Sequence, residues 1–250
     1  MDSRSARILE ILMEQGKVQV SKLAEYLDVS QVTVRKDLDQ LEEQGLIHRE
    51  HGCALLLPRD DMNSRMAYHY EIKRQIARLA AETVKNGETV MIESGSCCVL
   101  LADELARRKR DVTIVTNSAF IAAYIRKVPD VKIVLLGGDY QAQAQVMVGP
   151  ITRKCAEEYF VDKLFIGTDG HLAHTGFTGG DRMRAEAVRD MAKQAAHVMV
   201  LTESEKFRSQ GVVALLQTQQ VSALFTDDKI PRSSEQDLKK HGVAVYKVTV

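Results

Sequence analysis

The stretch from Val20 to Gly52 gathers side chains whose chemistry suits contact with a DNA duplex. Arginine and glutamine form paired hydrogen bonds with base edges in the major groove, whereas lysine and hydroxyl groups suit phosphate oxygens. The candidate contact residues are Lys22, Ser30, Gln31, Thr33, Arg35, Lys36, Arg49 and His51. Those from Gln31 to Lys36 fall in one predicted helix, so its exposed face would present them together.

Apolar spacing predicts two consecutive helices that would position this set. Ser21 is expected to cap the first helix and Ser30 the second, since a hydroxyl accepts hydrogen bonds from free N–H groups at a helix start. Gly45 is expected to end the second helix, because glycine accepts the left-handed conformation found there. The buried stripes are predicted from Leu23, Ala24 and Leu27 in the first helix, and from Val34, Leu38 and Leu41 in the second.

A supporting helix over residues 6–14 and a hairpin over residues 46–57, centred on Gly52, complete a predicted winged helix-turn-helix. Two alternatives stay open on pattern alone: another small three-helix domain, or a winged domain that binds protein. Residues 1–60 hold eight basic and eleven acidic residues, a net charge of −3. DNA binding would therefore require the basic residues to gather on one face.

A second group of candidate residues follows predicted strands and suits a phosphorylated ligand. Small hydroxyl and glycine residues at a helix start expose backbone N–H groups to a phosphate, and a lysine adds a cation. These residues are Gly95, Ser96, Cys97, Asn117, Ser118, Gly137, Gly138 and Lys206, with Asp169 placed to accept from sugar hydroxyls. The alternative for any single turn is ordinary turn chemistry.

Strands and helices alternate from residue 71 to residue 250, which predicts an α/β domain with a mostly parallel sheet covered on both faces. Ligands of such sheets bind beyond the carboxyl ends of the strands, where these turns would lie. The expected organisation is a DNA-binding domain over residues 1–57, a linker over residues 58–70 and a ligand-sensing domain over residues 71–250.

Composition narrows the class of protein further. The chain has 250 residues, 27% of them charged, and a net charge of zero, as in soluble globular proteins. No apolar stretch approaches the roughly 20 residues that cross a bilayer, and the start lacks a signal-peptide core, so a cytoplasmic protein is expected. The cysteines, Cys53, Cys97, Cys98 and Cys155, show no metal-binding spacing and are expected as reduced thiols; no cofactor is predicted.

The N-terminal segment resembles the DNA-binding region of the DeoR family of bacterial transcription regulators. The matching pieces are Val29-Ser30, Thr33-Val34-Arg35-Lys36-Asp37-Leu38 and Arg49-Glu50-His51-Gly52. Residues 73–228 resemble the sensor domain of that family, through SGS at 94–96, VTNS at 115–118, LGG at 136–138, FIG at 165–167 and EKF at 205–207. Departures from the family pattern are Cys53 in the wing, Cys97 and Cys98 after Ser96, and Glu205 before Lys206.

The resemblance implies a repressor of a carbohydrate-utilisation operon that a phosphorylated sugar releases from its operator, acting as a homodimer or homotetramer. It also implies a sensor fold related to ribose-5-phosphate isomerase. The sequence leaves two enzymatic alternatives. An isomerase needs a placed carboxylate base, and the nearest glutamate, Glu186, falls inside a predicted helix. A nucleophilic enzyme would use Ser96, Cys97 or Cys98, for which the sequence shows no histidine partner.

Overall fold

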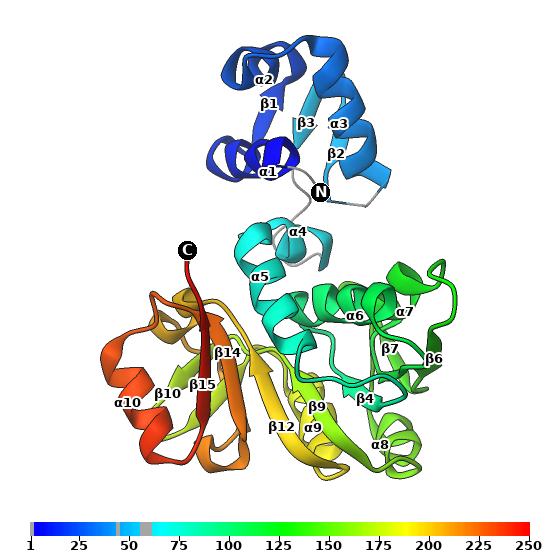
Figure 1. Ribbon diagram of the computed structural model, residues 1–250, viewed down its shortest axis with the longest axis vertical. Helices are drawn as coiled ribbons and strands as arrows, with labels where there is room; N and C mark the ends of the chain where they lie inside the picture. Colours follow the sequence, from blue (N-terminus) through cyan, green and yellow to red (C-terminus); the bar gives the residue numbers. More distant parts are fainter. Residues whose placement is uncertain (1–2, 44–45, 56–61) are drawn as a thin grey trace. The chain divides into compact units, whose positions relative to one another are not determined.

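The computed structural model describes residues 3–43, 46–55 and 62–250, which form two compact units, Met1–Glu71 and Ile72–Val250 (Figure 1). The first unit contains helices α1 (Ser3–Gln15), α2 (Val20–Leu27) and α3 (Gln31–Glu43) and strands β1 (Lys17–Gln19), β2 (His48–Glu50) and β3 (Cys53–Leu55). Helix α4 (Met62–Ala67) lies within the predicted linker, which is therefore partly helical. The ends of the DNA-binding domain at residue 57 and of the linker at residue 70 remain predictions.

Helices α2 and α3 form the predicted helix-turn-helix, with one correction at its start. Ser21 lies inside α2, whose N-cap is Gln19 with no side-chain hydrogen bond, because strand β1 runs directly into the helix. Asp28 ends α2 in the left-handed conformation, with φ of 51°. Ser30 begins the next helix as predicted, since its Oγ accepts from the Thr33 backbone N–H at 3.1 Å. The predicted stop at Gly45 lies outside the described residues.

Burial and one ion pair hold the three helices together. Val34, Leu38 and Leu41 of α3 are fully buried, as the spacing predicted. The Arg4 guanidinium of α1 donates to both carboxylate oxygens of Asp37 on α3, at 2.5 and 2.9 Å. A two-point arginine–carboxylate contact fixes direction as well as distance, so α3 is held at a defined orientation in the domain.

The wing is a three-stranded antiparallel sheet in the order β1–β3–β2. The predicted hairpin is confirmed, and β1 adds a third strand that the sequence did not reveal. His51 and Gly52 at the tip both have positive φ, 49° and 77°, as a tight two-residue hairpin turn requires. Cys53 pairs with Glu50 in the sheet, an extended conformation open to any residue, so the second glycine of the family pattern is not needed there.

The second unit is built on a seven-stranded parallel sheet in the order β15–β14–β12–β9–β4–β5–β6, which confirms the predicted fold class. Its strands are β4 (Thr89–Ile92), β5 (Thr113–Thr116), β6 (Lys132–Leu135), β9 (Val161–Ile166), β12 (Ala195–Leu201), β14 (Ala223–Asp227) and β15 (Ala244–Val248). Its α-helices are α5 (Tyr70–Ala81, which begins at the unit boundary), α6 (Ser96–Arg108), α7 (Ala119–Ile125), α8 (Pro150–Glu157), α9 (Arg182–Ala192) and α10 (Arg232–Lys240).

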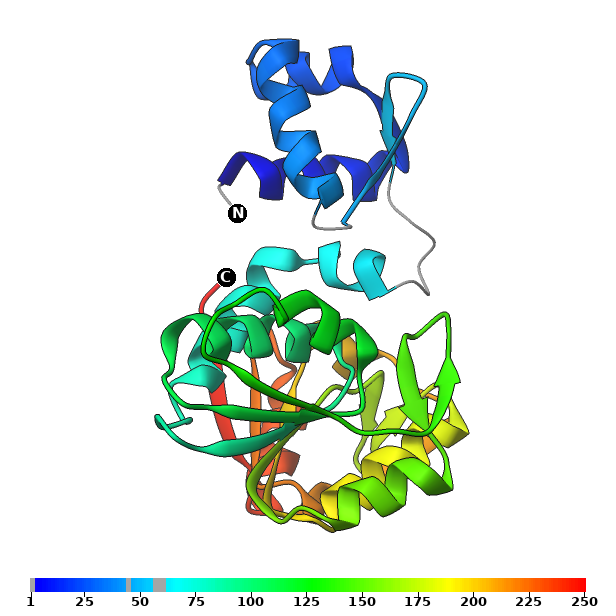
Figure 2. The same ribbon diagram turned by 90° about the vertical axis from the view of Figure 1, so that its right-hand side faces the viewer.

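Helices cover both faces of this sheet, as predicted. Figure 2 shows α5, α6 and α7 on one side and α8 and α9 on the other. The central strands are accordingly apolar on both faces: Leu164, Phe165 and Ile166 of β9 are fully buried in succession. Helix α5 stops at Ala81, and just beyond it the Thr83 hydroxyl donates to the Ala80 carbonyl at 2.6 Å.

Two small antiparallel sheets were not predicted. One is the hairpin of β7 (Asp139–Gln141) and β8 (Val146–Val148), and the other joins β10 (Gly170–Leu172), β11 (Gly176–Gly179) and β13 (Val213–Leu216). The short helical turns η1 (Ser204–Arg208) and η2 (Thr218–Gln220) flank β13. Among the described residues, no helix has both the length and the apolarity needed to span a membrane.

Candidate DNA-binding and ligand-binding sites

Helix α3 presents an exposed polar and basic face at its N-terminal end. Gln31, Arg35 and Lys36 are all exposed, and the Arg35 guanidinium lies 3.5 Å from the Gln31 amide oxygen. Lys22 is exposed on the preceding helix. These four side chains can reach a ligand without unpacking the domain, because all four are already exposed.

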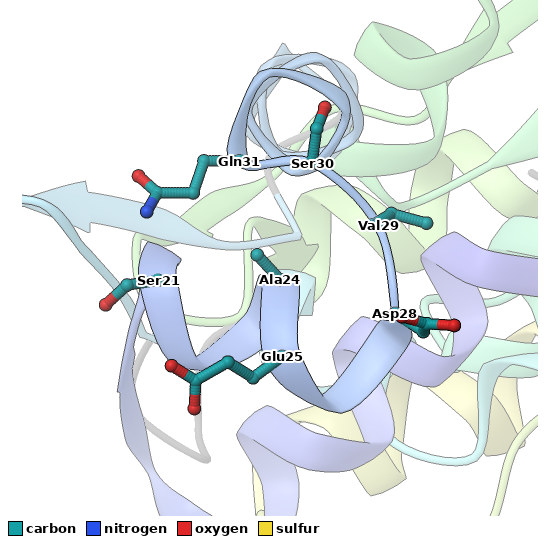
Figure 3. A pocket seen from close by; sticks show the side chains of 7 residues that line it. All are labelled: Ser21, Ala24, Glu25, Asp28, Val29, Ser30 and Gln31. Atoms are coloured by element: carbon teal, nitrogen blue, oxygen red, sulfur yellow. The ribbon is translucent and has the colours of Figure 1, made fainter.

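The hydroxyl groups of Ser30 and Thr33 are engaged within the turn. Their oxygens lie 2.9 Å apart, and Ser30 Oγ also caps the helix. A shallow hollow of about 430 Å³ separates α2 from the start of α3, and Figure 3 shows Ser21, Glu25 and Gln31 projecting on one side of it. Carboxylates of Glu25 and Asp28 line this hollow, so it does not suit a phosphate.

The structure places the two wing candidates in different surroundings. The Arg49 guanidinium is bound by carboxylates of α3, at 2.6 Å from Asp39 and 2.7 Å from Glu42. The hydrogen bond from Arg49 stabilises the Glu42 carboxylate and so lowers the pKa of Glu42. His51 sits at the wing tip with its side chain 88% exposed, 3.3 Å from Glu50. Arg49 therefore ties the wing to α3, while the His51 ring faces solvent.

In the second unit, strand register brings the candidate turns to one edge of the sheet. Ile92 of β4 pairs with Thr116 of β5 and with Phe165 of β9, and Phe165 pairs with Met199 of β12. Because the strands are parallel and in register, the turns that follow them lie at the same edge of the sheet. The turns that begin near residues 93, 117, 167 and 202 therefore follow neighbouring strands there.

Glu203 is the centre of a buried polar cluster at this edge. Its carboxylate lies 3.1 Å from the Lys73 ammonium of α5, and both side chains are at most 5% exposed. The Cys97 thiol of α6 donates to the second carboxylate oxygen at 3.8 Å. Glu203 thus connects the start of the unit, the α6 N-terminus and the end of β12.

Charge balance in this cluster shifts two pKa values. Burial opposes ionisation of Glu203, but Lys73 and, less strongly, Lys206 outweigh it, so the pKa of Glu203 lies below its usual value. Burial, followed by the charge of Glu203, raises the pKa of the Cys97 thiol well above its usual value. Cys97 is therefore a protonated hydrogen-bond donor, and a protonated thiol is a poor nucleophile.

The backbone is close-packed where β4 and β9 end. A side chain at Gly95 would place its Cβ 2.9 Å from the Gly167 Cα, so glycine is required at this approach. Glu93 accepts from the Gly167 N–H at 3.2 Å and from the Ser94 hydroxyl at 2.7 Å. These contacts fix the chain that leads into the α6 N-terminus, where Ser96 is partly exposed.

Asn117 and Ser118 are buried at the end of β5. The Asn117 amide donates to the Met147 carbonyl at 3.0 Å, and Ser118 caps α7 by accepting from Ile121 at 3.1 Å. Within the described part of the chain, the Asn117 side-chain oxygen has no hydrogen-bond partner. Ser118 therefore has a structural task, whereas Asn117 keeps one buried acceptor.

The remaining ligand candidates are held by local contacts. The Gly137 carbonyl accepts from Thr152 at 2.8 Å, and Gly138 packs against the same threonine. Asp169 accepts from the Gly180 N–H at 2.9 Å, which joins it to the end of β11. Lys206, on η1, is partly exposed and forms no ion pair among the described residues.

Sequence reasoning did not name three residues at these strand ends as site candidates: Lys73, Glu93 and Glu203. Together with Cys97 they form what we call the strand-end cluster. The role of Lys73 could have been predicted from its spacing: it stands three and four positions before the core residues Ile76 and Ala77, on the same face of α5. A lysine on the buried stripe of a helix needs a buried partner. Glu93 directly follows the apolar run that ends at Ile92, and Glu203 follows the run that ends at Leu201 after one threonine, which was also visible in the sequence.

A winged helix-turn-helix followed by a parallel-sheet domain with a polar strand-end cluster defines a DNA-binding transcriptional regulator. Family models agree over nearly the whole chain: the DeoR-like helix-turn-helix domain matches residues 4–59, and the DeoR C terminal sensor domain matches residues 68–228. The chain belongs to the DeoR family.

Curated relatives of similar length carry regulator names. The chain is 30% identical over 251 residues to the putative aga operon transcriptional repressor of Escherichia coli O157:H7, covering 98% of the chain and 93% of the relative. It is 30% identical over 240 residues to the glycerol-3-phosphate regulon repressor of E. coli K12, covering 94% of each. It is 26% identical over 250 residues to the L-fucose operon activator of Haemophilus influenzae, covering 97% and 98%.

Solved structures with partial similarity include ribose 5-phosphate isomerase from Plasmodium falciparum, at 14% identity and a TM-score of 0.42 over 57% of the chain and 55% of the isomerase. The probable sor operon regulator from Shigella flexneri has 10% identity and a TM-score of 0.45 over 68% and 88%.

Proposed function

We propose that this regulator represses a carbohydrate-utilisation operon from the cytoplasm and leaves its operator when a phosphorylated sugar binds the second unit. The observation that supports a phosphorylated ligand is the position of the Lys206 cation. Lys206 forms no ion pair among the described residues, and its backbone N–H donates to the Glu203 carbonyl at 3.1 Å, so it lies beside the buried Glu203–Lys73 pair. The name of the glycerol-3-phosphate regulon repressor refers to a phosphorylated compound and supports the same class, and the name of the aga operon repressor supports repression of an operon.

The proposed ligand site combines a cation with free backbone donors. Ser96 and Cys97 begin α6, whose first N–H groups lack helical partners and suit a phosphate. The buried oxygen of Asn117 and the carboxylate of Asp169 are proposed to accept from sugar hydroxyls, and the turns at Gly137 and Ser118 to shape the site. No metal or cofactor is assigned to it.

The proposed operator site is the exposed face of α3, with Lys22 on α2 and the wing. We assign base contacts to Gln31 and Arg35, and phosphate contacts to Lys22, Lys36 and His51. Ser30 and Thr33 contribute through the helix N-terminus that they shape, and Arg49 by holding the wing. Two reading helices of a homodimer or homotetramer would lie about 34 Å apart, one DNA turn.

Release requires that the ligand bind the DNA-incompetent arrangement more tightly than the competent one. The test is a thermal-shift screen with glucose 6-phosphate, fructose 1-phosphate, galactosamine 6-phosphate and glycerol 3-phosphate, each beside its non-phosphorylated parent. A phosphorylated compound should raise the melting temperature and its parent should not. The same compound should dissociate the protein from a duplex selected out of random sequence. Stabilisation by the parents alone would refute the ligand class.

We also propose that the protein does not interconvert ribose 5-phosphate and ribulose 5-phosphate. Glu186, the nearest candidate base, is half-exposed on α9 and lies 3.2 Å from Arg182. The purified protein should show no enzymatic rate in this reaction. Turnover that disappears in Glu186→Gln would overturn this proposal and establish an isomerase.

Activation is a second candidate, favoured by the name of the L-fucose operon activator. A reporter fused to the promoter beside the selected operator separates the two. Deletion of the regulator gene should raise expression under the repressor proposal and lower it under the activator alternative.

A further inference from the structure

The reading face of α3 contains one apolar side chain, Val32, that the domain itself leaves uncovered. Val32 is 61% exposed, whereas Val34, two positions later, is fully buried. Two positions correspond to about 200° around an α-helix, so Val32 points almost directly away from the core stripe. Arg35 and Lys36, three and four positions later, flank it on the same face.

The position of Val32 in the helix decides what it would meet on DNA. It is the second residue of α3, immediately after Gln31. In a helix-turn-helix the N-terminal residues of the second helix approach base edges in the major groove. The apolar group that the major groove offers is the C5-methyl of thymine, and aliphatic side chains contact it.

We infer that Val32 is a specificity-determining residue that reads a thymine methyl group in each operator half-site. The inference rests on the proposed assignment of α3 as the reading helix. Polar neighbours bind hydrogen-bonding edges and phosphates, and Val32 supplies the apolar contact between them. A β-branched residue gains nothing in helix propensity at this exposed position, so contact with DNA gives it a function that folding does not.

Deoxyuridine lacks only the methyl group of thymidine, which makes the test direct. A duplex selected from random sequence by the wild-type protein is resynthesised with deoxyuridine at one thymidine position at a time. Wild-type affinity should fall about fourfold at one position in each half-site, the cost of one buried methyl group. For Val32→Ala the selected duplex should bind more weakly, and the loss at that position should disappear.

Control variants separate reading from folding. Val32→Ile keeps the apolar contact and should keep the deoxyuridine loss. Tyr26→Ala removes another exposed apolar side chain, 53% exposed on α2, and should leave the wild-type deoxyuridine profile unchanged. The melting temperature of Val32→Ala should be no lower than that of wild type, because the side chain is outside the core and alanine favours the helix.

The outcomes are distinguishable. If Val32→Ala binds like wild type and keeps every deoxyuridine loss, Val32 is a bystander and the inference is overturned, while DNA binding through α3 stands. If Arg35→Ala also binds the selected duplex like wild type, α3 is not the reading helix and the proposed operator site fails with it.

Discussion

The two charged regions of this regulator differ in how their charges meet solvent. On α3, Arg35 and Lys36 are exposed. At the strand ends of the second unit, Lys73 and Glu203 are paired at 3.1 Å with almost no exposure. Removing an exposed charge changes what the surface can bind, whereas removing one member of a buried pair strands the other in an apolar interior. Loss of the exposed charges on α3 should therefore leave folding intact, whereas loss of Lys73 or Glu203 should destabilise the fold.

The largest expected effect comes from Lys73→Met, which leaves the Glu203 carboxylate buried without its cation. The free energy of unfolding should fall by about 3–5 kcal/mol, measured by urea denaturation at pH 7. Lys239→Met is the matched control, because the Lys239–Glu235 pair has a short 2.7 Å contact with a largely exposed lysine. The control should lose at most about 1 kcal/mol. Equal losses would remove the distinction between the two kinds of charge.

At acid pH the free energies of unfolding of Lys73→Met and wild type should differ less than they do at pH 7. The pKa of Glu203 is lowered in the folded wild-type protein, so its contribution to stability is present above the ordinary glutamate pKa and is lost as pH falls. Without Lys73, protonation of Glu203 relieves the unpaired charge. The stability deficit should be largest near pH 7 and smaller at about pH 4, near the ordinary value. A deficit independent of pH would point to lost packing of the lysine stem.

Arg35→Ala should weaken operator binding by about 1–3 kcal/mol if its guanidinium makes a paired base contact. Binding is measured by fluorescence anisotropy in matched salt. The melting temperature should be unchanged, because the side chain is exposed. Unaltered operator affinity would show that α3 has been assigned wrongly.

Lys206→Ala should weaken binding of the phosphorylated sugar by about 1–2 kcal/mol, the value of a partly exposed charged hydrogen bond. Operator affinity without ligand should stay intact, and a reporter strain should remain repressed when the inducing sugar is supplied. Calorimetry of ligand binding and anisotropy of operator binding give the comparison. Parallel loss of both affinities would make Lys206 structural.

The smallest of the predicted effects is a loss of about 1 kcal/mol of stability in Ser30→Ala, because this substitution removes the cap that accepts from Thr33. Ser21→Ala is its control, since Ser21 lies inside α2 and caps nothing. Thermal melting of the first unit should fall for Ser30→Ala and stay near wild type for Ser21→Ala. Similar melting of both variants would contradict the cap geometry.

Elements with a strong apolar period could be predicted from the sequence. The stripe of Val34, Leu38 and Leu41 located α3, and the alternation of strands and helices after residue 71 indicated the mostly parallel sheet. The sheet of β10, β11 and β13 could not be found this way, because β11 reads Gly176-Phe177-Thr178-Gly179 and its burial comes from packing against other segments. Ser21 failed as a cap because β1 leads directly into α2, a tertiary arrangement that the local pattern does not contain.

The partners of charged residues were the least predictable part of the sites. Arg49 looked available for DNA, yet Asp39 and Glu42, ten and seven positions earlier, bind its guanidinium. Lys73 and Glu203 are separated by most of the second unit in sequence and meet only because β12 ends beside α5. Residue type and spacing can nominate such groups, but folding decides which of them remain available to a ligand.

The engagement of Arg49 has a consequence for how the regulator searches DNA. Every phosphate contact releases counterions, and their number sets how steeply affinity falls with salt. With Arg49 neutralised by two carboxylates and a net charge of −3 over residues 1–60, few counterions would be released. We expect a shallow salt dependence, brief stays on random sequence and little long-range steering. Residence at the operator would then depend mainly on base recognition, and the chain would spend little time sliding along unrelated DNA.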